Sequence, residues 1–205
     1  MNEPTNIKAR MGIKYNYKFT VATHKVLARI LVEKVDKYKN CCVSMIQLAI
    51  EQNKKKFEKD ICNALRNYNG IFKDKLKVYE VHNLVPNVLR YELATLISGT
   101  TVTPTFKANY MAVGDDATAP TNSDTQLGNE TLRGGFTNRY AIENVAYLDK
   151  FFSSAEVGGT SIQEAGIFVD GSATPGSGYL LSHTLHSESM AVSETLTVNS
   201  TVSIS

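Results

Sequence analysis

Two segments near opposite ends of the chain alternate between apolar and polar residues, and this pattern constrains the fold most. The apolar positions of the first are Ile13, Tyr15, Tyr17, Phe19 and Val21. Those of the second are Val192, Leu196, Val198, Val202 and Ile204. Because successive side chains of a strand point to opposite faces of a sheet, both segments predict strands with one apolar face. We expect the first strand to join the sheet formed by the carboxy-terminal half.

Between these strands the apolar period changes to that of a helix. After Thr23, a suitable N-cap residue, one stripe runs from Val26 to Tyr38, and after Asn40 a second stripe runs from Val43 to Tyr68. The pattern predicts an α-helical hairpin over residues 23–72, inserted between the first strand and a second strand at 76–81. An amphipathic helix follows, which begins near Pro86 and ends at Gly99.

After Gly99 the chain consists of short apolar runs separated by Gly, Ser, Thr, Asn and Asp. This texture is typical of an all-β sandwich or barrel. We expect strands near residues 107–113, 139–152, 161–169, 178–186 and 192–204. The predicted fold class is therefore mainly β with a helical insertion (α+β). Residues 1–22 and 73–205 form an antiparallel β-sandwich with one packed helix, and residues 23–72 form the inserted hairpin.

Charge is divided unevenly along the chain. Residues 1–90 contain 18 Lys and Arg against 8 Asp and Glu, a net charge of +10, whereas residues 91–205 contain 4 against 12, a net charge of −8. Lys54, Lys55 and Lys56 form a run in the helical segment, interleaved with acidic residues, as on a solvated helix face. We interpret the split as a docking surface in an assembly, with these lysines as candidates. Nucleic-acid binding is the alternative that a basic segment leaves open.

The sequence lacks the usual signatures of catalysis and metal binding. It contains no nucleophile elbow, phosphate-binding loop, H-E-x-x-H or C-x-x-C motif. His183 and His186 lie three residues apart on a predicted strand, so we expect them on opposite faces and not as a metal pair. Asp115, Asp116 and Asp124 fit a solvated acidic turn better than a calcium loop. We therefore expect a protein that is not an enzyme and has no cofactor.

Possible targeting segments and the cysteines indicate the cellular compartment. Residues 1–10 have no apolar core after their basic residues, and no run of about 18 apolar residues exists, so we expect neither signal peptide nor membrane anchor. Cys41, Cys42 and Cys62 have no partner at metal-ligand spacing and are expected to be buried or half-buried free thiols. The sequence predicts synthesis in a cytoplasm.

Linked motifs cover residues 75–205. They are the stretch from His82–Val85 (HNLV) through the predicted helix to Gly99, then Tyr110–Pro120 (YMAVGDDATAP), Asn122–Leu127 (NSDTQL) with Glu130 and Arg133 after it, Glu164–Phe168 (EAGIF) and Glu194–Ile204 (ETLTVNSTVSI). In order and spacing they resemble the β-domain of tailed-bacteriophage virion proteins described as tail-fibre-like or minor structural proteins. The chain departs from that pattern at Asp115-Asp116, where Thr-Gly is frequent, and at Asn199-Ser200, where an aromatic residue is usual. Residues 23–72 lie outside the resemblance.

The motif residues also have physical interpretations of their own. Gly114 is expected to adopt a backbone conformation closed to other residues, and Pro120 to fix an extended exit from the turn. Leu127 would pin the long loop to the core. Gly166 indicates a bulge or a close backbone approach, and Glu164 is expected to pair with Arg133 or Arg139 across the sheet.

The resemblance implies a non-enzymatic virion structural protein of the tail, baseplate or fibre-attachment region, made in the host cytoplasm. Such a subunit would form homo-oligomers and dock onto other virion proteins, without membrane or nucleic acid. A capsid-decorating or neck protein of the same fold is one alternative. Another is a carbohydrate-binding domain for host adhesion, in which Tyr140, Tyr147 or Tyr179 would stack on a host glycan instead of filling the core.

Overall fold

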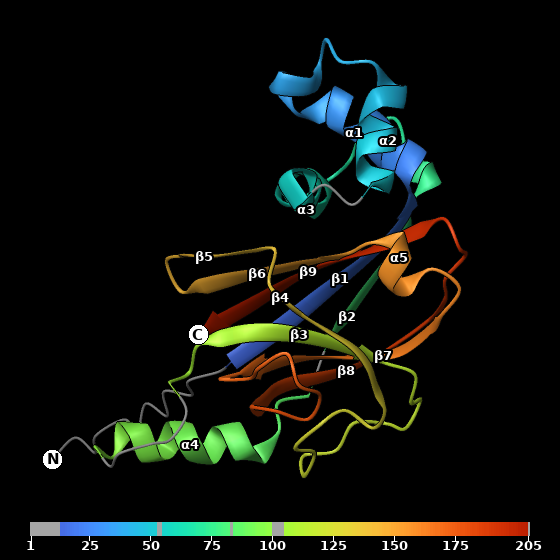
Figure 1. Cartoon of the computed structure of the whole chain (residues 1–205). Coiled ribbons are helices and arrows are strands. Elements are labelled where there is room, and N and C mark those ends of the chain that lie inside the picture. Colours follow the sequence, from blue (N-terminus) through green and yellow to red (C-terminus); the bar gives the residue numbers. More distant parts are fainter. Residues whose placement is uncertain (1–12, 53–54, 83, 100–104, 205) are drawn as a thin grey trace, which may run out of the picture.

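A computed structural model describes residues 13–52, 55–82, 84–99 and 105–204. Two antiparallel sheets face each other, and helices flank them (Figure 1). The five-stranded sheet has the order β2 (Lys77–His82), β1 (Ile13–Thr23), β9 (Glu194–Ile204), β6 (Val145–Phe152) and β5 (Asn138–Ile142). The four-stranded sheet has the order β4 (Glu130–Gly135), β3 (Ala108–Gly114), β7 (Ser161–Val169) and β8 (Tyr179–Ser189). The predicted class, mainly β with helices, is confirmed.

The first and last described strands pair along their whole length. Ile13 lies opposite Ile204, and Thr23 lies opposite Glu194. Strand β1, which comes from the basic half, therefore lies inside the sheet between β2 and β9, and β9 comes from the acidic half. This confirms the expectation drawn from the alternation of residues 13–21.

Three details of the strands differ from the prediction. Strand β4 was not expected, and the expected strand at 139–152 is a hairpin, β5 and β6, with Glu143 in the left-handed region at φ 52°. Val192, predicted to share the apolar face of β9, precedes that strand and is 80% exposed. Leu196, Val198 and Val202 do face the core as predicted.

The main core fills the space between the sheets. Its largest side chains come from β1 (Tyr17, Phe19), β6 (Phe152) and the four-stranded sheet (Met111, Ile167). Burial of such side chains contributes about 1.5–3 kcal/mol each. The alternation seen in the sequence therefore fixes which face of each strand is buried.

The helical segment has its own core. Its described residues form three α-helices, α1 (His24–Lys34), α2 (Val43–Glu51) and α3 (Glu58–Arg66), where the sequence predicted two. Their apolar faces pack together and against Ala22 of β1 and Phe151 of β6, on the outer side of the five-stranded sheet. Figure 1 shows this group beyond that sheet. Thr23 occupies the N-cap position of α1 without a side-chain cap bond.

Two further helices accompany the sheets. Helix α4 (Asn87–Ile97) contacts β8 and ends where Gly99 adopts φ 77°, as the sequence predicted. Helix α5 (Ser154–Val157), which was not predicted, begins with a capping box between Ser153 and Glu156.

Candidate functional site

Four of the five motif residues singled out in the sequence lie together on the four-stranded sheet. A Cβ at Gly114 would collide with the backbone oxygen of Asn129 and the carboxylate of Glu164. Its φ lies outside the left-handed region, so the expected special conformation is wrong, and close packing is what requires glycine here. Pro120 lies half-buried in the adjoining loop.

Leu127 and Gly166 fit together. Leu127 is buried with Ala112, Phe168 and Leu180. A Cβ at Gly166 would come within 2.9 Å of both Leu127 Cδ2 and Leu180 Cδ1. The glycine in β7 thus leaves the space that the leucine of the loop occupies.

Glu164 does not pair with either arginine proposed from the sequence. Its carboxylate accepts hydrogen bonds from the backbone N–H groups of Gly128 (2.9 Å) and Asn129 (2.7 Å). Arg133 instead pairs with Glu130 at 2.6 Å, and Arg139 donates to the carbonyl of Ala108 at 2.9 Å. The predicted pairing is wrong because backbone donors occupy the carboxylate.

His183 lies between Glu164 and the long loop, a position that nothing in the sequence indicated. Its Nε2 lies 2.8 Å from Glu164, and its Nδ1 lies 2.8 Å from Asp124 of the loop. Burial raises the pKa of Asp124, but hydrogen bonds from Thr121 and the nearby His183 outweigh it and lower the pKa overall. The cluster, Asp124, Glu164 and His183, fastens the loop of residues 115–129 onto β7 and β8.

His186 faces the other side of β8, as predicted. Its ring stacks on Phe19 with centroids 4.0 Å apart, and burial lowers its pKa to about 4. Among the described residues, no group of His, Cys, Asp and Glu has the arrangement of a metal site.

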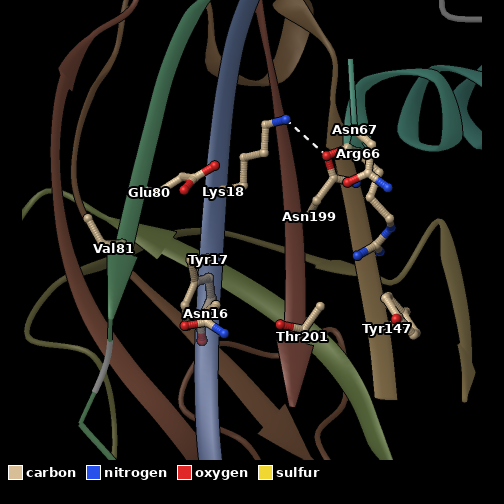
Figure 2. Close-up of a pocket in the computed structure, with 10 residues that line it drawn as sticks. All are labelled: Asn16, Tyr17, Lys18, Arg66, Asn67, Glu80, Val81, Tyr147, Asn199 and Thr201. Carbon is tan, nitrogen blue, oxygen red and sulfur yellow. Dashed lines mark hydrogen bonds between the residues drawn. The ribbon is translucent and has the colours of Figure 1, made fainter. Parts of the chain in front are cut away.

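A groove of about 370 Å³ lies on the outer face of the five-stranded sheet, beside the end of α3 (Figure 2). Two cross-strand rows form its floor. One row runs from Glu80 through Lys18 to Asn199, and the other from Asn16 through Thr201 to Tyr147. The polar face of β1 and β9, visible in the sequence as alternation, supplies most of these side chains.

Helix α3 closes one side of this groove with Arg66 and Asn67. The Arg66 guanidinium lies 4.7 Å from the Tyr147 ring centre and pairs with Asp149, which is fully buried. Lys18 Nζ donates to the carbonyls of Leu65 (3.0 Å) and Arg66 (2.9 Å) at the end of α3. Burial lowers the pKa of Lys18, and it raises that of Asp149.

The tyrosines proposed for sugar stacking are divided between surface and core. Tyr140 and Tyr147 stack on each other with centroids 4.8 Å apart on the outer face, and Tyr140 is 39% exposed. Tyr179 packs against the main core. The interpretation of these tyrosines as core residues therefore holds for Tyr179 alone.

The basic and acidic halves meet within one chain. Besides Arg66 and Asp149, Lys77 pairs with Glu188 at 2.8 Å and with Glu194 at 3.1 Å. Of the lysine run, Lys55 and Lys56 are exposed, and Lys54 lies outside the described residues. Cys41, Cys42 and Cys62 are free thiols, as expected, but Cys41 and Cys42 are exposed and Cys62 alone of the three is buried.

Comparisons of the chain with protein-family models, curated proteins and solved structures found no match. None of the helices formed by the described residues combines the length and apolar character that a membrane span requires. The features that bear on function are therefore the sequence motifs, the cluster of Asp124, Glu164 and His183, and the groove beside α3.

Proposed function

We propose that this chain is a non-enzymatic structural subunit of a tailed-bacteriophage particle, in the tail, baseplate or fibre-attachment region. One observation supports the proposal most. Three of the segments that carry the resemblance, Tyr110–Pro120, Asn122–Leu127 and Glu164–Phe168, lie apart in the sequence and yet contribute to one unit in space. Their spacing therefore has a common structural cause, the seating of one long loop on β3 and β7.

The helical segment offers a surface suited to docking onto other virion proteins. Met45 and Leu48 of α2 are 72% and 54% exposed, and Lys55 and Lys56 are exposed nearby in the chain. Exposed apolar side chains rimmed by charge are typical of protein interaction sites. Because the net positive charge of the basic half is only partly offset by pairs within the chain, we expect docking and self-association to weaken at high salt.

The proposal is tested on particles of the phage or prophage that encodes this chain. Density-gradient-purified particles are analysed by mass spectrometry and by labelling with an antibody against the protein. The expected result is a band of label at the tail or baseplate. Label on the neck or capsid would overturn the proposed position, and absence of the chain from purified particles would overturn the structural role.

Charge-reversal variants test the docking surface. Lys55→Glu with Lys56→Glu is expected to reduce incorporation into particles in a complementation assay, because it inverts an exposed basic surface. Lys73→Glu with Lys75→Glu, also exposed, serves as the matched control and is expected to incorporate normally. Equal incorporation of both pairs, or association of the purified protein that does not change between dilute and molar salt, would contradict charge-driven docking.

A further inference from the structure

The imidazole ring of His183 is held between two carboxylates. Its Nε2 lies 2.8 Å from Oε2 of Glu164 on β7, and its Nδ1 lies 2.8 Å from Oδ2 of Asp124 in the loop of residues 115–129. This loop leaves the end of β3 and returns to the sheet at β4 (Figure 1). The His183 side chain is 5% exposed, and that of Glu164 is 1% exposed. The protein itself therefore determines what each ring nitrogen binds.

The partners of the two carboxylates indicate that both are ionised. The two oxygens of Glu164 each accept a hydrogen bond from a backbone N–H group of the loop. Such hydrogen bonds favour the charged form of a carboxyl group. Burial raises the pKa of Asp124, but hydrogen bonds from Thr121 and the nearby His183 outweigh it, so this carboxyl is ionised at neutral pH.

The ring must carry two protons to bind both carboxylates. An ionised carboxylate only accepts hydrogen bonds, and a neutral imidazole has a single N–H group. A neutral ring would therefore turn the lone pair of one nitrogen toward a carboxylate oxygen 2.8 Å away, which is repulsive. The imidazolium form donates to Asp124 and Glu164 at once, and hydrogen bonds between ionised groups are stronger than those between neutral groups.

The other charges near the ring favour the same form. Asp116, in the same loop, has a pKa lowered by hydrogen bonds from Thr118 and, to a smaller extent, by the positive charge of His183. Within the part of the chain that the structure describes, no lysine or arginine pairs with the carboxylates bound to the ring. The described charged side chains of β8 and of the elements packed against it form no ion pair with the ring; apart from Glu164, they are Lys77 and Glu80 of β2, Arg90 and Glu92 of α4, and Glu188 of β8. His183 thus supplies the positive charge of this cluster.

We propose that His183, protonated on both ring nitrogens, is a pH-sensitive latch that holds the loop of residues 115–129 on β7 and β8 and releases it when the pH rises. A neutral ring can donate to one carboxylate alone, so its contact with Asp124 or with Glu164 is lost and the loop is held less firmly. Since the latched state binds the proton, the stability that the latch contributes is present at low pH and is lost as the pH rises through the deprotonation of the ring. Release uncovers the apolar site in which Leu127 packs against Phe168. This regulation goes beyond the structural role proposed above and does not depend on it.

Nitrogen NMR of the full chain tests the charge of the ring. At about pH 5.5 we expect both ring nitrogens of His183 to be protonated. His186, on the opposite face of β8, is the control within the same spectrum, because burial lowers its pKa to about 4 and its ring is expected to be neutral at that pH. A single ring proton on His183 at about pH 5.5, or two that persist at about pH 9, would overturn the proposal.

Hydrogen exchange over the same pH range tests the release of the loop. Protection factors are compared, because they already correct for the intrinsic effect of pH on exchange. As the ring of His183 deprotonates, we expect the protection of the Gly128 and Asn129 amides to fall about tenfold or more, since one charge-assisted hydrogen bond of the latch is lost. The amides of β1 and β9 are expected to keep theirs. Unchanged protection of Gly128 and Asn129 through the titration of the ring would contradict the latch.

Two variants assign the effect to the latch. His183→Gln has no ring to titrate, so the protection of the loop is expected to become independent of pH over this range. Asp124→Asn removes one of the two carboxylates that hold the proton and is expected to move the loss of protection to lower pH. Asp36→Asn, an exposed aspartate of the helical segment, is the matched control and is expected to behave as the unmodified chain does.

If His183→Gln does not fold, Asp124→Asn still decides the question, because Asp124 lies in the loop and its side chain is 21% exposed. Loss of protection at the same pH in Asp124→Asn as in the unmodified chain would overturn the assignment of the latch to His183. The presence or absence of the chain in particles is measured separately, so failure here leaves the structural role untouched.

Discussion

Replacing Glu164 by glutamine tests the contact that seats the long loop on the four-stranded sheet. The carboxylate is 1% exposed and accepts from two backbone N–H groups, Gly128 and Asn129, while His183 binds the same oxygen as Gly128. Glutamine has almost the same shape but only one acceptor oxygen. Its NH₂ group must therefore face one of the two backbone N–H groups, donor against donor.

The contacts set the size of the effect. One charge-assisted hydrogen bond, worth about 1.5–3 kcal/mol, is lost, and a buried N–H group is left without an acceptor at a cost of about 1–3 kcal/mol. These costs overlap, so we expect Glu164→Gln to lower the free energy of unfolding by about 3 kcal/mol. For a chain of 205 residues, this corresponds to a decrease in Tm of about 6–12 °C.

Thermal unfolding and urea denaturation measure the loss, and hydrogen exchange locates it. We expect the amides of Gly128 and Asn129 to lose protection in Glu164→Gln while those of β1 and β9 keep theirs. Glu143→Gln, the same substitution at an exposed turn, is the control and should change stability by less than about 0.5 kcal/mol. If both variants unfold like the unmodified chain, the Glu164 contacts do not hold the loop.

Three further substitutions have outcomes set by burial and charge. Leu127→Ala, which empties a buried site, should cost about 2–5 kcal/mol in urea denaturation and make the loop of residues 115–129 sensitive to limited proteolysis. Burial lowers the pKa of His186 to about 4. Between about pH 6.5 and 4 the unfolded chain therefore binds a proton at this residue that the native chain does not, and the free energy of unfolding decreases as the pH is lowered through this range. His186→Phe should unfold with a urea midpoint that falls less over this range, and an unchanged fall would contradict the reasoning. The pKa of Asp124 is lowered, so its contribution is present at neutral pH and lost as pH falls through its native value; Asp124→Asn should therefore be less stable than the unmodified chain at pH 7, and the two should converge in acid.

The sequence predicted the strands that carry a regular alternation or a short apolar run, and it missed β4, which carries neither. Strand β1 was found because its apolar residues recur at every second position. Strand β4, by contrast, contains Gly134 and Gly135 and no alternation. Gly134 pairs with Met111 and Gly135 with Tyr110, so contacts with another strand, β3, place these residues in the sheet. Such contacts leave no periodic trace in the local sequence.

The partners of Glu164 illustrate a second limit on what the sequence predicts. Opposite charge favoured Arg133 or Arg139 as its partner. Its actual partners include two backbone N–H groups, and every non-proline residue has one. The sequence could identify Glu164 as a residue with a specific role, but only the position of the loop shows what it binds.

The polar face of β1 and β9 illustrates a third limit on what the sequence predicts. Alternation shows that a face is polar, but it does not show whether water or another element covers it. Thr20, Thr197 and Asn199 lie on that face and are all buried, because the helical segment packs over it. The groove forms where α3 ends at Arg66 and this cover stops.

Asn199 belongs to the pair at which the chain departs from the phage pattern, and it contacts the helical segment that covers this face of the sheet. The helical segment of residues 23–72 lies outside the resemblance, and the pair Asn199-Ser200 departs from it, although the two are far apart in the sequence. In the structure they touch, since Asn199 donates to the Cys62 carbonyl of α3 and to Asp149, the partner of Arg66. The asparagine is thus explained by the helical segment that it contacts.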